Sequence, residues 1–209
     1  MRTRRNRGRT QAERTAATRK ALIDATVTSL VERGFTRTTT TNVVKDARVS
    51  LGALSHHFPS KTELMTATVA HLLERRQGEF REQVAAVGAG PDRVEKAIDA
   101  LWAAFSGPTF VAWVELWVGG RRDPELASAV LDMQDQFMTS SRELFAELFP
   151  PQQYAGTGLD ERSMALAFAV MEGVALKSIA GDPADTAPVD LLKLLARTRI
   201  TDPGAAARR

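Results

Sequence analysis

The sequence predicts an all-α protein of roughly nine helices, in which a small N-terminal three-helix domain precedes a larger helical domain. Three observations lead to this prediction. Apolar residues recur at intervals of three and four, proline and glycine separate these stretches at helical lengths, and no β-branched run has a partner strand. A chain of 209 residues that is 44% hydrophobic is large enough to fill such a core.

Composition excludes several classes of protein. There is no cysteine, which excludes disulfides and cysteine-based metal or nucleophile sites and fits a reducing cytoplasm. The longest apolar run, residues 164–171, is far shorter than the roughly 18 residues of a transmembrane helix. We therefore expect a cytoplasmic protein with no membrane association, no metal and no cofactor.

Charge divides the chain into two parts. Residues 1–61 hold 13 Lys and Arg against 4 Asp and Glu, or +9, and residues 62–209 hold 15 against 21, or −6, which together give +3. We expect residues 1–12 to form a flexible basic arm and residues 199–209 a flexible tail. This asymmetry is typical of a protein whose N-terminal part binds a polyanion. The arginines of the arm are Arg2, Arg4, Arg5, Arg7 and Arg9.

The first two helices are predicted from caps and spacing. Thr10 and Glu13 form a capping-box pattern, and the helix that follows is expected to end at Gly34. Residues 36–44 are rich in β-branched side chains and would suit a strand by propensity alone. Because no partner strand follows, and because a threonine in the 38–40 region can cap a helix, we predict a second helix at residues 40–47.

A third short helix and a long fourth one follow. Ser50 is a suitable N-cap for residues 51–57, and Pro59 disfavours helical geometry in the residue before it. Ser60 and Glu63 form a second capping box, which begins a helix that runs from residue 61 to about residue 87. Residues 13–60 are therefore expected to be a separate helix-turn-helix domain.

The remaining helices are predicted from the glycine and proline clusters between them, which separate five helical stretches. Together with the helix that begins at residue 61, these stretches are expected to form a second domain at residues 61–198. The five stretches are residues 92–105, 109–118, 124–149, 160–180 and 189–198.

The stretch from residue 34 to residue 64 contains a specific set of residues: Gly34, Phe35, Thr38, Thr39, Val43, Ala47, Val49, Ser50, Gly52, Leu54, His57, Phe58, Ser60, Lys61 and Leu64. In these residues the stretch resembles the N-terminal signature of the TetR family of transcriptional regulators. The resemblance implies a homodimer that binds double-stranded DNA at a palindromic operator, usually as a repressor, and responds to a small apolar or amphipathic effector. It covers only this stretch, because the C-terminal domains of the family diverge widely.

Two positions depart from the family pattern. Arg48 stands where the family usually has glycine in the turn, so the turn either accepts a left-handed backbone or adopts another shape. Ser55 stands where the family usually has tyrosine. The serine keeps a hydroxyl group but has no aromatic ring. We expect the DNA contacts of this protein to differ from those of its relatives at these two positions.

Residues that contact DNA are expected along the second and third helices. By resemblance, Lys61 and His57 contact phosphates, although a solvated lysine and a packed histidine are the simpler alternatives. Leu51 and Ala53 can contact thymine methyl groups. The full set is Thr40, Thr41, Arg48, Leu51, Gly52, Ala53, Ser55, His56, His57 and Lys61.

An aromatic stretch in the second domain is the candidate effector pocket. Aromatic side chains at helical spacing more often belong to a hydrophobic core than to a ligand pocket, but the family resemblance favours a pocket here. The candidate residues are Trp102, Phe105, Phe110, Trp113, Trp117, Met133 and Phe137.

A dimer interface is expected on the last two helices. Residues 160–180 are apolar on more than one face, so both sides of this helix need a cover. The alternative to a second subunit is a central helix of one monomer. The candidate interface residues are Met164, Phe168, Met171, Ala175, Leu191, Leu192 and Leu195.

The leading hypothesis is therefore a ligand-responsive, homodimeric transcriptional regulator. One alternative is a DNA-bound regulator with no small-molecule effector. An all-α enzyme is the other, and the sequence argues against it because it has no metal cluster, no glycine-rich phosphate loop between strand and helix, and no converging Ser/His/acid set.

Overall fold

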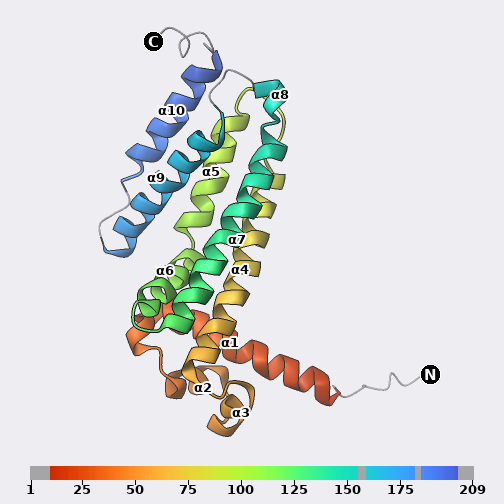
Figure 1. The fold of residues 1–209 in the computed structure, drawn as a ribbon, viewed down its shortest axis with the longest axis vertical. Coiled ribbons are helices and arrows are strands. Elements are labelled where there is room, and N and C mark those ends of the chain that lie inside the picture. The colour runs from red at the N-terminus through yellow and green to blue at the C-terminus, as the bar shows by residue number, and fades with distance from the viewer. Residues whose placement is uncertain (1–9, 155–158, 182–184, 202–209) are drawn as a thin grey trace, which may run out of the picture. The chain divides into compact units, whose positions relative to one another are not determined.

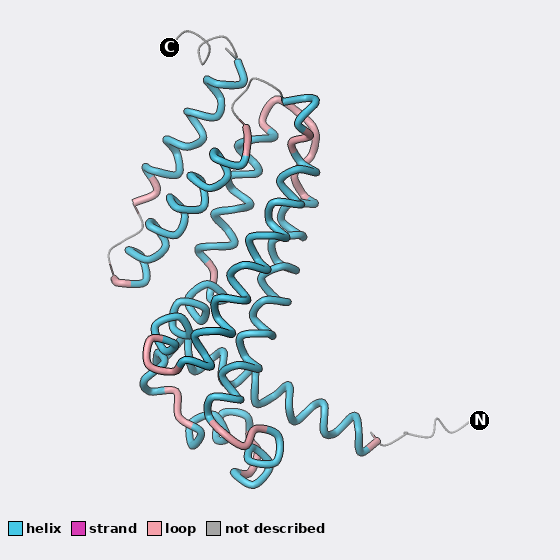
Figure 2. Tube along the Cα trace, in the orientation of Figure 1, coloured by secondary structure: helices cyan, strands magenta, loops and turns pink. Residues whose placement is uncertain are grey.

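The computed structural model describes residues 10–154, 159–181 and 185–201, and within these ranges the chain forms ten helices and no strand (Figures 1 and 2). The predicted fold class is confirmed. The helices are α1 (Gln11–Arg37), α2 (Thr40–Ala47), α3 (Leu51–His57), α4 (Lys61–Ala85), α5 (Arg93–Ser106), α6 (Pro108–Gly120), α7 (Pro124–Leu148), α8 (Pro151–Tyr154), α9 (Glu161–Ile179) and α10 (Ala187–Thr201).

Helices α2 and α3 have the predicted bounds, and the β-branched run before residue 44 is helical. Some bounds differ from the prediction: α1 begins at Gln11, inside the predicted arm, and α10 reaches Thr201, inside the predicted tail. Two further differences concern the helices themselves. The short helix α8 lies where a loop was predicted, and α1 does not end at Gly34. Instead, Gly34 adopts φ 77° and ψ 170°, a conformation that only glycine reaches without strain, and helical structure resumes as far as Arg37. Gly34 is therefore a kink within α1.

The chain folds into two compact units. Unit 1 contains residues 1–71 and 112–130, and unit 2 contains residues 72–111 and 131–209. Helices α4, α6 and α7 each contribute residues to both units. The sequence predicted a domain boundary at residue 60, and that boundary stays a prediction. Besides the N-terminal helices, compact unit 1 includes the first turns of α4, the end of α6 and the start of α7.

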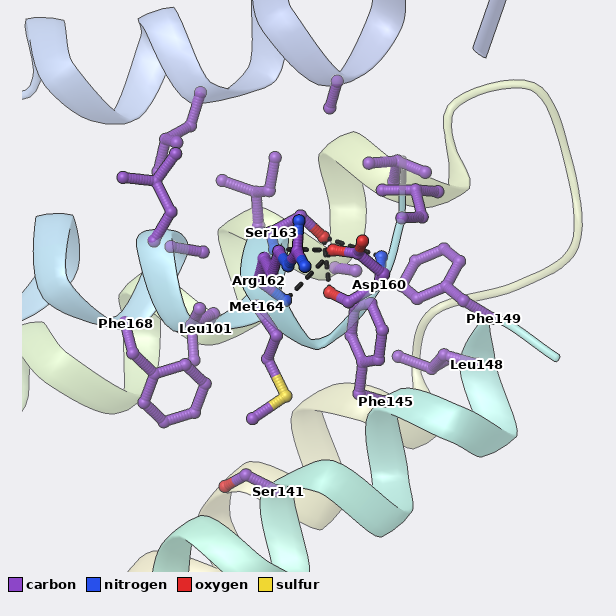
Figure 3. Close-up of a pocket in the computed structure, with 18 of the residues that line it drawn as sticks. Leu101, Ser141, Phe145, Leu148, Phe149, Asp160, Arg162, Ser163, Met164 and Phe168 are labelled. Carbon is purple, nitrogen blue, oxygen red and sulfur yellow. Dashed lines mark hydrogen bonds between the residues drawn. The ribbon is translucent and has the colours of Figure 1, made fainter. Parts of the chain in front are cut away.

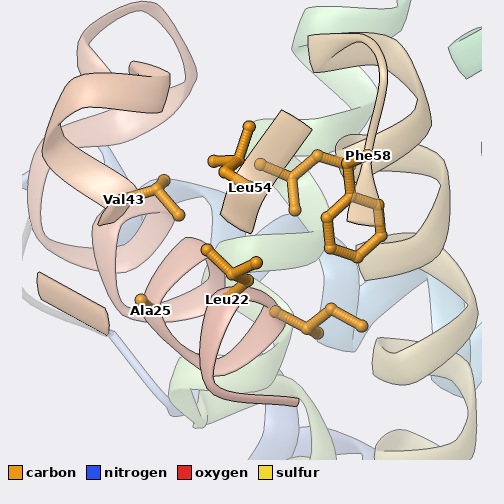
Figure 4. Packing of buried hydrophobic residues seen from close by; sticks show 7 residues of the cluster. Leu22, Ala25, Val43, Leu54 and Phe58 are labelled. Carbon is orange, nitrogen blue, oxygen red and sulfur yellow. The ribbon is translucent and has the colours of Figure 1, made fainter. Parts of the chain in front are cut away.

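Unit 1 has its own hydrophobic core. Leu22 and Ala25 of α1 face Val43 of α2 and Leu54 of α3, and Phe58, just after α3, packs in the same cluster (Figure 4). Leu22 and Val43 are fully buried. One or two apolar side chains from each short helix thus hold the pair against α1, since helices this short are not stable alone.

The end of α6 packs against the kink in α1. The Phe35 backbone N–H donates a hydrogen bond of 2.6 Å to a carboxylate oxygen of Glu115. A Cβ atom on Gly119 would overlap the Phe35 ring, so the two helices approach each other closely here. Nearby, the Thr62 hydroxyl donates a 2.7 Å hydrogen bond to Asp123, which lowers the pKa of that carboxyl. Unit 1 is therefore more than a three-helix domain.

Unit 2 is built around α5, α9 and α10, which pack against one another (Figure 1). Two ion pairs join α10 to α5, one between Arg197 and Glu95 and one between Lys193 and Asp99. Exposed pairs of this kind stabilise little by themselves. They join two helices that also pack against each other through apolar side chains.

A buried arginine lies among the aromatic residues of unit 2. Arg76 of α4 is 3% exposed, and its guanidinium carbon lies 4.0 Å from the ring centroid of Phe137 and 5.4 Å from those of Phe105 and Phe110. Burial lowers the pKa of Arg76 to about 10, against the opposing effect of two glutamates, so the side chain stays charged at neutral pH. Cation–π contacts offset part of its desolvation.

Among the described residues, no single helix has both the length and the hydropathy needed to cross a membrane, and only the bent pair α5 and α6 passes that test when taken together.

Candidate nucleic-acid interface and ligand cavity

Side-chain caps define both helices of the helix-turn-helix. The Thr39 hydroxyl accepts the N–H of Asn42 at the start of α2, and the Ser50 hydroxyl accepts the N–H of Ala53 at the start of α3, at 3.2 and 3.1 Å. Each cap satisfies an N–H group that the helix leaves without a partner. The sequence predicted the serine cap, and the threonine cap lies within the predicted region.

Arg48 ends α2 in the left-handed conformation, with φ 57° and ψ 40°. It is the only described non-glycine residue with a positive φ. Its N–H bonds to the Lys45 carbonyl, and the N–H of Val49 bonds to the Val44 carbonyl. These bonds close the helix in the way a C-terminal glycine usually does. The turn therefore keeps the shape expected for glycine, the first of the two predicted outcomes, and the arginine bears the strain.

One face of this helix pair is exposed. Leu54 is buried against α1, and Leu51, Ser55 and His56 on the same helix are exposed, Leu51 by 58%. An exposed leucine at the start of a helix that has a well-filled core on its other side is available for apolar contact. The exposed predicted DNA-contact residues are Thr41, Arg48, Leu51, Gly52, Ser55 and His56, and the partly buried ones are Thr40, Ala53, His57 and Lys61.

Lys61 and His57 have intramolecular neighbours. The Lys61 ammonium lies 4.7 Å from the ring centroid of Phe35, and burial lowers the pKa of this lysine. Burial also lowers the pKa of His57, with smaller effects from His56 and Arg19, so the imidazole is neutral at pH 7. A neutral imidazole can still donate one N–H to a phosphate oxygen. Both side chains border the exposed face, and the predicted phosphate contacts stay predictions.

Unit 2 contains a cavity of about 440 Å³ between α4, α5, α7, α9 and α10 (Figure 3). Its walls are mainly aliphatic and aromatic. Figure 3 shows Phe145 of α7 and Phe149, just after α7, on one side and Met164 and Phe168 of α9 on the other. This volume falls in the usual range for small-molecule sites. The polar groups among the lining residues are Ser141, Asp160, Arg162 and Ser163.

The predicted pocket residues lie elsewhere. Among the described residues that line the cavity, none belongs to the aromatic set that the sequence singled out. Phe105, Phe110 and Phe137 of that set surround Arg76, and Trp117 is 55% exposed. The cluster of Phe105, Phe110 and Phe137 is therefore better described as part of the hydrophobic core than as the lining of a pocket. The remaining members are Trp102, which is partly buried, and Trp113 and Met133, which are buried.

Sequence reasoning missed the lining residues, and only a weak signal marks them. Helix α5 contributes Val94, Ala97, Ile98 and Leu101, which follow a normal helical core pattern. Residues that fill a core and residues that line a cavity show the same apolar spacing in the sequence. Whether a cavity forms depends on how completely the side chains of the opposite helix fill the space between the helices.

The predicted dimer interface divides into two parts. Met164, Phe168, Met171 and Ala175 are at most 6% exposed, so other parts of the same chain already cover them. The alternative of a central helix within one monomer describes these four residues. On α10, Leu191 and Leu195 are 53% and 47% exposed, and Leu192 is partly buried in the cavity wall. Residues 1–9 of the predicted basic arm, which hold its five arginines, and residues 202–209 of the predicted tail lie outside the described residues.

The capped helix pair, its filled core and its exposed second helix define a helix-turn-helix protein of the DNA-binding class. A family model described as bacterial regulatory proteins, tetR family, matches residues 22–68. The HTH-type transcriptional regulator BetI of Burkholderia thailandensis is 30% identical over 172 residues, which cover 80% of this chain and 85% of BetI. The chain belongs to the TetR family of DNA-binding transcriptional regulators, and its relatives are regulators, not enzymes.

Other relatives agree with this assignment. An uncharacterized HTH-type transcriptional regulator of Mycobacterium bovis is 29% identical over 151 residues, which cover 70% of this chain and 77% of the relative. A TetR-family regulator from Rhodococcus sp. has a similar fold, with a TM-score of 0.66 at 17% identity, over 88% of this chain and 98% of that one. FadR of Bacillus subtilis, solved in complex with stearoyl-CoA, has a TM-score of 0.63 at 15% identity, over 87% of this chain and 97% of FadR.

Proposed function

We propose that this regulator is a cytoplasmic, homodimeric repressor that binds a palindromic operator and releases it when a small apolar or amphipathic effector occupies the cavity of unit 2. The observation that carries the ligand response is the cavity itself. A space of about 440 Å³ with mainly apolar walls costs stability when it is empty, because the side chains around it have fewer packing partners.

For the DNA contacts, we propose that α3 enters the major groove. Leu51 and Ala53 would contact thymine methyl groups, and Ser55 and His56 would supply hydrogen bonds to base edges or phosphates. The exposure of Leu51, Ser55 and His56 and the filled core behind them support this assignment. Arg48, at the end of α2, adds a charge beside α3. Thr40, Thr41, Gly52, His57 and Lys61 complete the proposed contact set.

For the response to the effector, we propose that α4 transmits the effect of ligand binding from the cavity to the helix-turn-helix. The helix begins with Lys61 and Leu64 in unit 1 and continues to Phe80 and Val84, which line the cavity in unit 2. A ligand that displaces Phe80 acts on the same helix whose first turn follows the helix-turn-helix in the chain. We propose that the effector shifts the population of α4 positions and so changes the separation of the two α3 helices in the dimer.

Support for an apolar effector comes from the cavity walls. FadR, which has a similar fold, was solved with stearoyl-CoA, so this fold can hold a ligand with a long apolar chain. The effector site that we propose is the cavity and not the aromatic cluster around Arg76, since that cluster is filled by its own side chains.

Selection of bound sequences from random duplex DNA tests the operator proposal. We expect two inverted half-sites, and we expect Leu51→Glu to abolish enrichment while Leu131→Glu, at an exposed leucine of α7, leaves it unchanged. Enrichment of a single, non-symmetric site would contradict the dimer.

The effector proposal needs a second experiment. In a thermal-shift screen of uncharged apolar compounds, a true effector raises the melting temperature and weakens operator binding at the same concentration. If no compound does both, and Ala97→Phe, which fills the cavity, leaves operator binding unchanged, the protein is a DNA-bound regulator without an effector. Operator placed downstream of a reporter promoter distinguishes a repressor, which lowers expression, from an activator.

A further inference from the structure

The last turns of α6 and the residues just after them contact both α1 and the start of α4. The Phe35 backbone N–H donates a 2.6 Å hydrogen bond to a carboxylate oxygen of Glu115, and the Phe35 ring lies so close to Gly119 that a Cβ atom there would overlap it. Just after α6, Asp123 accepts a 2.7 Å hydrogen bond from the Thr62 hydroxyl. All five residues belong to unit 1. One part of the chain thus holds a residue of α1 and a residue in the first turn of α4.

The ring of Phe35 meets the first residue of α4. The ammonium of Lys61 lies over this ring, 4.7 Å from its centroid, which is within the range of a cation–π contact. Both side chains are partly buried, so water screens the contact less than it would at a fully exposed site. The helix dipole disfavours a positive charge at the start of α4, and the negative face of the ring offsets part of that cost.

The contact with the ring leaves the ammonium of Lys61 able to bind an anion. Lys20, Lys96 and Lys193 each pair with a carboxylate, at 2.6, 2.8 and 2.5 Å. The ammonium of Lys61 instead lies against a ring, which attracts its charge but accepts no conventional hydrogen bond from its three N–H groups. Those groups can still donate to a phosphate oxygen.

A ring that holds this lysine lowers the cost of ordering its side chain on DNA. Lysine has a flexible four-carbon side chain, which loses much of its rotamer freedom when its ammonium is fixed against a phosphate. A side chain that already rests on a ring has lost part of that freedom before DNA binds, so less is lost in the complex. The ring also limits the directions in which the ammonium can point.

We propose that Phe35 is a positioning residue for DNA binding, whose ring orients the Lys61 ammonium toward a DNA phosphate and is itself held in place by α6. This inference rests on the proposed function, because it requires that Lys61 contacts DNA. It adds a role for Glu115 and Gly119, which lie far along the chain from the helix-turn-helix and fix the ring. Phe35 acts through Lys61 and makes no DNA contact of its own.

A purely structural role for Phe35 predicts a different result. If the ring only fills space between α1 and α6, its loss lowers the stability of unit 1 and leaves the number of phosphate contacts unchanged. If the ring positions Lys61, its loss also removes part of the lysine's contribution, so operator affinity falls and depends less steeply on salt. The salt dependence of operator binding therefore separates the two roles.

The experiment is a double-mutant cycle on the full-length protein with its selected operator duplex. Fluorescence anisotropy measures operator affinity over a range of salt concentrations for Lys61→Met, Phe35→Leu and the double variant, and circular dichroism gives the melting temperature of each. Phe110→Leu is the matched control, because its ring faces the guanidinium of Arg76, at 5.4 Å, and not Lys61. This control should lower the melting temperature and leave operator affinity unchanged.

We expect Lys61→Met to weaken operator binding and to make the slope of log affinity against log salt shallower by about two for a dimer, or about one for each phosphate contact. Phe35→Leu should weaken binding by about fivefold for each subunit and make the slope shallower as well. In the Lys61→Met background, Phe35→Leu should have no further effect on affinity, since two residues that act through one contact are not additive.

Gly119→Ala tests the same contacts from α6. The added methyl group displaces the Phe35 ring, so operator affinity should fall when Lys61 is present and stay unchanged in the Lys61→Met background. Proton NMR of the wild type needs no substitution at all. The ε-methylene protons of Lys61 should resonate upfield of those of the exposed Lys177, because the face of an aromatic ring shields nearby protons.

Two results would overturn the positioning role alone. One is that Phe35→Leu, or Gly119→Ala where Phe35→Leu does not fold, has no effect on operator affinity or has the same effect with and without Lys61. The other is a Lys61 ε-methylene signal with no upfield shift. A Lys61→Met variant with unchanged affinity and salt slope would refute the phosphate contact in the proposed function as well, so the two failures are distinguishable.

Discussion

Arg48 offers a direct test of the turn between α2 and α3, because its backbone strain and its charge can be changed separately. The residue has φ 57°, a left-handed conformation that costs an L-amino acid about 1–2 kcal/mol and costs glycine nothing. Glycine loses more backbone entropy on folding, by about 0.5–1 kcal/mol. Arg48→Gly should therefore stabilise the protein by about 0.5–1 kcal/mol relative to Arg48→Ala, which keeps the strain.

Thermal unfolding followed by circular dichroism measures this difference. For a chain of this length, about 1 kcal/mol corresponds to a shift in melting temperature of roughly 2–4 °C. Arg48→Asn is an intermediate case, since asparagine tolerates the left-handed region better than alanine does. If Arg48→Gly melts no higher than Arg48→Ala, the left-handed turn is not strained and the reasoning is refuted.

The charge has a separate effect on DNA. Both Arg48→Gly and Arg48→Ala remove one cation from each subunit, so both should lower operator affinity. The slope of log affinity against log salt should become shallower by about one for each phosphate that the arginine neutralises. Equal affinity and an equal slope for wild type and both variants would show that Arg48 makes no DNA contact. Stability and affinity therefore report on different properties of one residue.

Three further predictions concern unit 1. Glu115→Ala should lower the free energy of unfolding by about 1–3 kcal/mol in urea denaturation, because the N–H of Phe35 loses a 2.6 Å acceptor, and Glu115→Gln should lower it less. Gly119→Ala should destabilise by about 1–3 kcal/mol through overlap with the Phe35 ring, whereas Gly78→Ala, in open space within α4, should stabilise by about 0.5–1 kcal/mol; equal effects would refute the close approach. Burial lowers the pKa of His57, so the folded protein binds a proton there less readily than the unfolded chain, and stability should fall as the pH drops below about 6.5; a stability profile of His57→Gln with the same acid-side loss would contradict this.

The helix-turn-helix was predictable because its signals are local. Thr39 and Ser50 cap helices whose bounds depend on a few neighbouring residues, and Pro59 limits α3 from the other side. Gly34 shows where local reasoning stops. The glycine was predicted to end the helix, but it only interrupts the helical backbone conformation, and the helix continues to Arg37 where Phe35 lies against Gly119, a residue far along the chain.

The cavity was not predictable, because it depends on how completely distant helices fill the space between them. Phe105 and Phe137 lie at helical core spacing, and nothing in their pattern reveals that they surround Arg76, a charged residue on α4. Met164 and Leu166 show the same limit for the interface. Both are apolar residues of α9, yet one is buried and the other is half exposed, and the composition of the helix does not distinguish them.

The exposed side chain of Leu51 has a consequence for how the operator could be regulated. If Leu51 enters the major groove as we propose, it contacts methyl groups on carbon 5 of a pyrimidine and makes no hydrogen bonds. An apolar side chain does not distinguish the methyl of thymine from the methyl of a 5-methylated cytosine at the same place in the groove. Enzymatic methylation of a cytosine in the operator would then change the affinity of this regulator for the operator without changing the operator's base sequence.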